Sequence, residues 1–147
     1  MKRFLAALAL VCAPVAAQAE TFTFRTTSTP IDRVMWPAST GLPVGASIFN
    51  STSVTTYADG KVSTTKGKCT NWGTPPGSQF FLAGACTYGD ASGELYTVQF
   101  NCQTTGKPQE SDCWGRLTGV GGAFKGRTGL IAFHSGGKGG GAGLWND

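Results

Sequence analysis

The residues of this chain that could do acid–base or ionic chemistry are few and scattered. His134 is the single histidine, and an imidazole titrates close to neutral pH, so it could act as a general acid or base. Glu94, at the start of an expected strand, could also transfer protons, and an inward-pointing Arg116 could anchor an anionic ligand. The alternative is that all three side chains are solvated. In that case His134, which shares a strand face with Leu130 and Ala132 by alternation, lies at an exposed strand end.

Other carboxylates lie near expected turns. Asp90 precedes Glu94 across a turn, and this pair could do acid–base work. Glu110 and Asp112 lie close together between two cysteines of the second half of the chain. Carboxylates in turns and at strand ends are usually solvated, so the sequence alone leaves their roles open.

Nucleophilic and nucleotide chemistry lack their usual motifs. No Gly-x-Ser-x-Gly elbow occurs, and a lone histidine permits only one Ser–His arrangement. No phosphate-binding glycine loop is present either, because the candidate stretch has Phe124 where the dinucleotide motif needs glycine. The sequence therefore predicts no cofactor and does not decide whether the protein is an enzyme.

The chain begins like a secretory signal peptide. Lys2 and Arg3 precede a short apolar run over residues 4–13, and Ala17-Gln18-Ala19 provides a small-x-small cleavage site. The run is shorter than the roughly 20 apolar residues that span a bilayer, and a short core helix is the alternative. We expect residues 1–19 to be the signal and residues 20–147 to form a single domain, periplasmic or secreted after cleavage following Ala19.

Four cysteines remain in the expected mature chain. An even number of cysteines in an exported domain indicates disulfides. Their spacings of 17, 16 and 11 residues lack the close Cys-x-x-Cys pair of zinc sites, so we expect no metal. These residues are Cys69, Cys86, Cys102 and Cys113.

The charge pattern argues against nucleic-acid binding. The chain has 12 basic and 8 acidic residues, and removing Lys2 and Arg3 with the signal leaves ten basic residues and a net charge of +2. These basic residues are dispersed, without the basic cluster and interleaved aromatics that nucleic-acid binding needs. The partner we expect is instead a small molecule. The sequence gives no oligomeric state.

The mature region has the pattern of an all-β protein. Short alternating runs recur between turn signals, and no segment shows a helical period. One feature interrupts them, a long loop over residues 28–46 in which Trp36 could cover a ligand as part of a lid, plug the barrel or serve packing alone. We expect eight strands, over residues 21–27, 47–57, 61–68, 78–88, 93–102, 113–119, 128–134 and 143–146.

Eight short antiparallel strands can close into a small barrel, which removes exposed sheet edges. A two-sheet sandwich is the alternative. A turn near Ala91 would place Cys86 opposite Tyr96, so Cys86 and Cys102 would not face each other. The other turns place Cys69 near Cys86 and Cys102 opposite Cys113. We therefore predict two disulfides, Cys69–Cys86 and Cys102–Cys113.

The most distinctive stretch is a glycine-rich turn between two expected strands. Its glycines permit positive φ and close backbone approach, and Phe124 can fold back as an apolar plug. The stretch resembles the signature of allene oxide cyclase-like and dirigent-like barrel proteins, and the chain end at residues 139–146 resembles their last strand in bacterial members. The matching residues are Gly119, Gly121, Gly122, Phe124, Gly126 and Gly129, followed by Leu130–His134.

This resemblance implies an eight-stranded antiparallel barrel with a partly apolar interior. The group includes cyclases and proteins that steer the coupling of phenolic radicals, but the matching stretch contains no catalytic group. Fifteen aromatic residues remain once Phe4 is removed from the sixteen of the chain, and they could line a cavity. The leading hypothesis is an exported barrel that binds a small, largely apolar ligand. The alternatives are a cyclase or dirigent-type enzyme and a non-catalytic surface or interaction protein.

Overall fold

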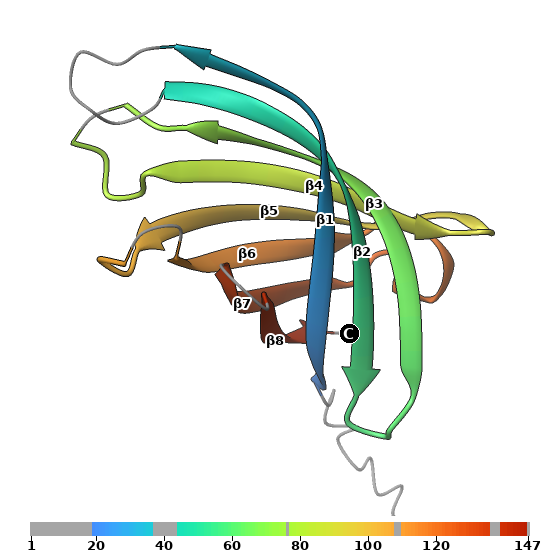
Figure 1. Ribbon diagram of the computed structural model, residues 1–147. Coiled ribbons are helices and arrows are strands. Elements are labelled where there is room, and N and C mark those ends of the chain that lie inside the picture. Colours follow the sequence, from blue (N-terminus) through green and yellow to red (C-terminus); the bar gives the residue numbers. More distant parts are fainter. Residues whose placement is uncertain (1–18, 37–43, 76, 108–109, 136–138, 147) are drawn as a thin grey trace, which may run out of the picture.

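The computed structural model describes residues 19–36, 44–75, 77–107, 110–135 and 139–146. Apart from Ala19, the expected signal peptide lies outside these ranges. In the described part, eight antiparallel strands pair in chain order and close into a barrel, because β1 pairs with both β2 and β8 (Figure 1). The predicted all-β eight-stranded barrel is confirmed, and the sandwich alternative is wrong. The strands are β1 (Glu20–Trp36), β2 (Val44–Tyr57), β3 (Val62–Gly73), β4 (Leu82–Asp90), β5 (Gly93–Thr104), β6 (Ser111–Gly119), β7 (Thr128–Ser135) and β8 (Gly140–Asn146).

Strands β1 and β2 are longer than predicted, and the loop expected over residues 28–46 is wrong for residues 28–36 and 44–46, which belong to strands. β1 continues to Trp36, which pairs with Val44 of β2, so the backbone of Trp36 belongs to a strand. The prolines led the prediction to a loop, but a strand accepts proline at an edge or a bulge. In the described residues β8 pairs only with Glu20–Arg25 of β1, and the β1–β2 register shifts between Pro30 and Asp32. Pro37 and Pro43 lie outside the described residues.

The first hairpin turn lies where the expected strand bounds place it, whereas β4 begins later than expected. The Asp59-Gly60 turn joins β2 to β3, with Gly60 at a φ of 84°. β4 starts four residues later than expected, at Leu82, because Ser78 is held in a turn in which its N–H donates to the carbonyl of Pro75.

The disulfides join neighbouring strands as predicted. Cys69 pairs with Cys86 across β3 and β4, and Cys102 with Cys113 across β5 and β6. The predicted register of the β4–β5 hairpin is wrong by two residues, since the turn pairs Asp90 with Gly93 and a further one-residue shift between Tyr88 and Gly89 places Cys86 opposite Val98. Cys102 then lies opposite Leu82, so the argument against a Cys86–Cys102 bond still holds.

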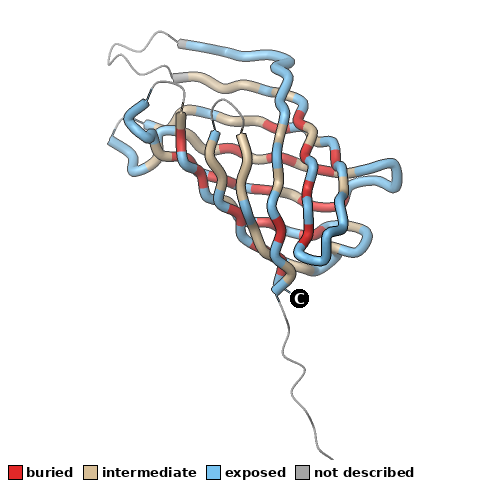
Figure 2. The backbone as a smooth tube through the Cα atoms, turned by 60° about the horizontal axis from the view of Figure 1, so that its bottom comes forward, coloured by how far each residue is buried: buried red, intermediate tan, exposed pale blue. Residues whose placement is uncertain are grey.

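Burial alternates along the strands, as expected where one face lines the interior and the other meets solvent (Figure 2). In β5, Tyr96, Val98, Phe100 and Cys102 alternate along the strand and are all buried. Large inward side chains lie across glycines of the adjacent strand. A Cβ at Gly67 of β3 would come within 2.7 Å of the Tyr88 ring, which is attached to β4.

One end of the barrel is closed by aromatic side chains. The glycine-rich turn after β6 forms a short 3₁₀ helix, η1 (Gly122–Phe124), and the ring of Phe124 packs 4.9 Å from that of Trp145 and 5.5 Å from that of Tyr96. This confirms Phe124 as an apolar plug. Arg127 lies 5.7 Å above the Trp145 ring and donates a 2.7 Å hydrogen bond to the carboxylate of Glu20, which ties the start of β1 to this end.

The two disulfides fit an oxidising, extracytoplasmic compartment. Among the residues that the structure describes, no helix has the length and apolar character needed to cross a membrane.

Candidate binding site inside the barrel

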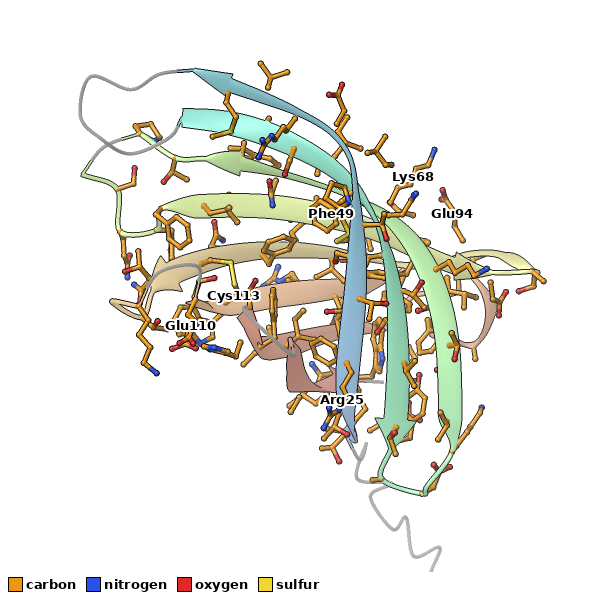
Figure 3. The ribbon with its side chains drawn as sticks, in the orientation of Figure 1. Arg25, Phe49, Lys68, Glu94, Glu110 and Cys113 are labelled. Carbon is orange, nitrogen blue, oxygen red and sulfur yellow. A yellow bond between two sulfur atoms is a disulfide. The ribbon has the colours of Figure 1, made fainter. Side chains whose placement is uncertain are left out.

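The barrel interior holds a cavity of about 200 Å³. Residues of all eight strands line it, and side chains crowd toward it from opposite walls (Figure 3). No Lys, Arg, Asp or Glu belongs to the described lining. A ligand in this space would therefore meet aromatic rings, aliphatic groups, hydroxyls and disulfide sulfurs, together with the amide of Asn71 and the imidazole of His134.

One wall of the cavity is aromatic and aliphatic. Phe133 of β7 packs edge-on against Phe24 of β1 and Phe100 of β5, with ring centroids 6.2 and 5.6 Å apart. Val98, Leu117 and Ile131 complete this wall between the rings. Its chemistry suits the body of an apolar ligand.

Another part of the lining carries hydroxyl groups on β2, with two tyrosines that come from β4 and β5. Ser51 and Tyr88 share a 2.9 Å hydrogen bond, and Thr65 and Tyr96 share another of the same length. We call this surface the hydroxyl wall. Its lining members are Ser51, Ser53, Thr55, Tyr57, Tyr88 and Tyr96.

Strand β2 reverses the usual amphipathic pattern. Its inward residues Ser51 and Ser53 are each 4% exposed, whereas its outward residues Ile48 and Val54 are 47% and 43% exposed. Burying hydroxyls while exposing aliphatic groups costs free energy unless the hydroxyls are hydrogen-bonded. The hydroxyl wall is thus a feature that packing alone does not favour.

Burial keeps the tyrosines of this wall neutral. Desolvation raises the pKa of Tyr88 above its ordinary value, although the hydrogen bond with Ser51 partly opposes that rise. The same effect, opposed by the hydrogen bond with Thr65, raises the pKa of Tyr96 to about 12. At physiological pH both phenols are therefore hydroxyl donors and acceptors and carry no charge.

The raised pKa of Tyr96 predicts a loss of stability in alkali. The contribution of neutral Tyr96 to the free energy of unfolding is fully present below pH ~10, the pKa of the unfolded state. It is lost as the pH rises toward the folded-state pKa of about 12. A difference of about two pKa units is equivalent to ~3 kcal/mol in the free energy of unfolding. Urea unfolding across this pH range measures the loss, and Tyr96→Phe should flatten the curve. Tyrosinate absorbance that appears in the folded protein near pH ~10 for Tyr96 would contradict the prediction.

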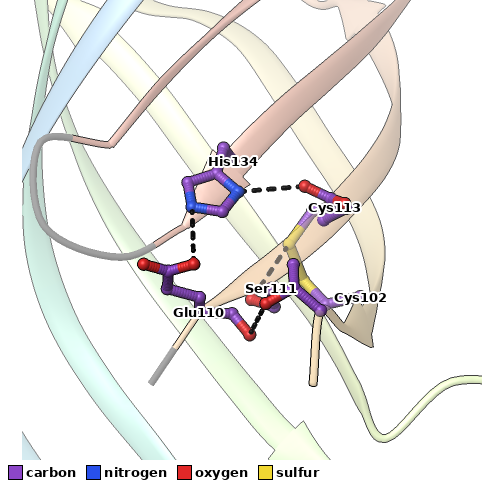
Figure 4. The surroundings of a disulfide bond; sticks show 7 residues. Cys102, Glu110, Ser111, Cys113 and His134 are labelled. Carbon is purple, nitrogen blue, oxygen red and sulfur yellow. Dashed lines mark hydrogen bonds and ion pairs between the residues drawn. A yellow bond between two sulfur atoms is a disulfide. The ribbon is translucent and has the colours of Figure 1, made fainter. Parts of the chain in front are cut away.

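His134 lies at the mouth of the cavity, within a small ionic cluster (Figure 4). Its Nδ1 lies 3.0 Å from Asp112 Oδ1 and its Nε2 lies 3.8 Å from Glu110 Oε2. Lys107 Nζ is a further 3.6 Å from that Glu110 oxygen. Because His134 and Asp112 face each other across the β6–β7 pair, the sequence candidates His134, Glu110 and Asp112 are brought together, next to the Cys102–Cys113 disulfide.

The other sequence candidates are not gathered at this mouth. Arg116 and Glu94 are both exposed. Arg116 lies opposite Leu130 on β7, and Leu130 is itself 54% exposed, so this pair is on the outer face. Glu94 is at the β4–β5 hairpin and points away from the barrel (Figure 3). The neighbouring Asp90 is also exposed. The side chain of Trp36 is outside the described structure.

The sequence predicted that aromatic residues could line a cavity, but it did not predict the hydroxyl wall. The signal that could have found it is the run of hydroxyl residues at every second position, at 51, 53, 55 and 57, in one strand. Among the described residues, no group of three or more His, Cys, Asp or Glu side chains is arranged to hold a metal ion.

In comparisons with known proteins, no family model, curated protein or solved structure matches the chain. The resemblance to allene oxide cyclase-like and dirigent-like barrels therefore stays a prediction.

Proposed function

We propose that this protein is an exported barrel, periplasmic or secreted after cleavage following Ala19, that binds a small, largely apolar molecule in its interior. The observation that carries the proposal is the cavity of about 200 Å³ enclosed between the aromatic and hydroxyl walls. Close-packed small proteins contain few voids larger than a water molecule, so an internal space of this size is a candidate ligand site.

The size of the cavity limits the ligand. An apolar cavity of about 150 Å³ accommodates benzene, and sites for drug-sized ligands usually exceed about 300 Å³. A space of about 200 Å³ therefore suits one ring with a short substituent. Larger lipids and fused ring systems would need the barrel to open.

Filling the cavity is expected to abolish binding. Val98 is buried, lines the cavity and faces Cys86 across the β4–β5 pair. In Val98→Phe the added ring would take up ligand space, so the affinity for toluene, followed by calorimetry or by chemical shifts of the interior aromatic rings, should fall by about tenfold or more.

The matched control is Thr97→Phe, which places the same ring on the outer face of the same strand and should leave toluene affinity within about twofold. Because overpacking can cost about 1–3 kcal/mol, circular dichroism would confirm that Val98→Phe is folded, and Leu117→Phe provides a second filling variant. Undiminished toluene binding by both filled barrels would place the site elsewhere.

A second candidate, a non-catalytic interaction protein, is favoured by the outer surface. Ile31, Val34 and Met35 are each about half exposed, on the part of β1 that extends past its pairing with β8. Large exposed apolar side chains concentrated in one segment are a feature of interaction surfaces. If the wild-type protein bound no ring-sized apolar probe, this candidate would take first place.

A further inference from the structure

The hydroxyl wall has more hydrogen-bonding capacity than its own contacts use. Ser51 and Tyr88 together carry two hydroxyl protons, and the 2.9 Å hydrogen bond between them uses one. The Tyr88 oxygen also lies 3.9 Å from Cys69 Sγ, and a disulfide sulfur is only a weak acceptor. A donor and several lone pairs are thus available at the cavity surface.

From this we propose, building on the function proposed above, that the ligand is an uncharged amphipathic molecule with one hydrogen-bonding group on a ring-sized apolar body. That group binds at the Ser51–Tyr88 pair, and the apolar body lies against Phe24, Phe100 and Phe133. The ligand therefore binds in one orientation.

The fold holds the Ser51–Tyr88 pair in place. Gly67 of β3 pairs with Ser51 on one side and with Tyr88 on the other, and the missing side chain lets the Tyr88 ring cross β3 to reach Ser51. The Tyr88 ring also stacks on Tyr96, with centroids 5.3 Å apart. Both residues line the cavity, and both are buried. Their position is thus fixed before a ligand arrives, which lowers the entropic cost of binding.

The same surface discriminates against two other ligand classes. A purely apolar ligand would cover the free donor of the pair without replacing the hydrogen bonds it could make to water, and such a loss is costly. A charged ligand would enter a cavity whose described lining has no Lys, Arg, Asp or Glu to pair with it. An uncharged group that both donates and accepts, such as an alcohol, avoids both penalties.

Three probes of nearly the same shape test this specificity. Benzyl alcohol, ethylbenzene and benzylamine share a ring and have the same number of non-hydrogen atoms, but end in a hydroxyl, a methyl and an ammonium group. Calorimetric titration of the full barrel should show that benzyl alcohol binds more tightly than ethylbenzene. Benzylammonium should bind about a hundredfold more weakly than the alcohol, or not measurably.

Removing both partners of the pair tests its role. In the double variant Ser51→Ala with Tyr88→Phe, neither hydroxyl is left without its partner, so the barrel should remain folded. The ratio of ethylbenzene to benzyl alcohol dissociation constants should fall by about tenfold, the contribution of one hydrogen bond. The matched control, Thr52→Ala with Thr87→Val, removes the neighbouring hydroxyls of the same strands, which alternate to the outer face, and should leave the ratio unchanged.

The outcomes separate this inference from the proposed function. If ethylbenzene and benzyl alcohol bind equally and the double variant does not change their ratio, the hydroxyl pair does not select the ligand, although the barrel still binds apolar molecules. If benzylammonium binds as tightly as the alcohol, the inference is also wrong. If no probe binds to the wild-type protein, the proposed function itself fails. Should the double variant be unstable, Tyr88→Phe alone must shift the ratio in the same direction.

Discussion

Replacing Cys69, Cys86, Cys102 and Cys113 together with alanine is expected to lower the free energy of unfolding by ~6 kcal/mol. The two cross-links close separate loops of 17 and 11 residues. Each constrains the unfolded chain by ~3 kcal/mol in the loop-entropy treatment, and because the loops do not overlap we expect the effects to add. A small domain has about 5–15 kcal/mol of stability in total, so the quadruple variant should be largely unfolded or only marginally folded.

The two disulfides should contribute nearly equally, since the entropy of loop closure depends on the logarithm of loop length. Urea unfolding of the wild type, each paired replacement and the quadruple variant measures this. A loss below ~1 kcal/mol for either pair would mean that the unfolded state already keeps those strands together. The same titrations with toluene would show whether the barrel must be cross-linked to hold its cavity, because Cys86, Cys102 and Cys113 all line it.

Local signals in the sequence predict much of this barrel. The Asp59-Gly60 turn sets the β2–β3 hairpin, and the alternation in β5 identifies which residues face inward. Both succeed because turn geometry and side-chain alternation are local consequences of the backbone. Disulfide pairing also followed, since it needs only the approximate positions of the turns.

The parts that sequence reasoning missed depend on tertiary context. Pro30 indicated a loop, but it lies in β1 where β8 no longer pairs, at a register shift that takes up the irregularity. The shift after Tyr88 moved the β4–β5 register by one residue beyond the error in the turn position, and nothing in the local sequence sets such a shift.

The site itself was only half predictable, and β2 shows why. Hydropathy would place Val54 inside and Ser53 outside, yet Val54 is 43% exposed and Ser53 is 4% exposed. The reversal becomes favourable only when Tyr88 and Tyr96 supply hydrogen bonds from other strands. Similarly, His134, Glu110 and Asp112 meet only because β6 and β7 pair in this register. The aromatic content of the chain suggested a cavity lined by rings, but it did not indicate which rings would lie next to hydroxyl groups.

Replacing Trp145 with alanine is expected to lower the free energy of unfolding by ~4 kcal/mol, which is typical when a buried aromatic ring is removed and a cavity is left. Trp145 is 2% exposed and contacts Phe124, Tyr96 and Arg127 at the closed end of the barrel. The matched control is Trp114→Ala, because Trp114 is 47% exposed on the outer face, and its loss should change stability by no more than ~0.5 kcal/mol. Urea unfolding of both variants measures the difference, and equal losses would contradict the described packing.

Trp145 also lines the cavity, so its removal tests how ligand size is set. If the closed end limits the space, Trp145→Ala should bind larger single-ring ligands than the wild type does, provided that the variant is folded at the temperature of the titration. The Ser51–Tyr88 pair contacts neither Trp145 nor Phe124 in the described structure, so the preference for benzyl alcohol over ethylbenzene should survive in this variant. Size and polarity would then be selected by different parts of the barrel: the closed end by its rings, and the hydroxyl wall by its free donor. If Trp145→Ala lost the preference for the alcohol, the aromatic rings at the closed end would instead position the hydroxyl wall through the stacked Tyr88 and Tyr96 rings.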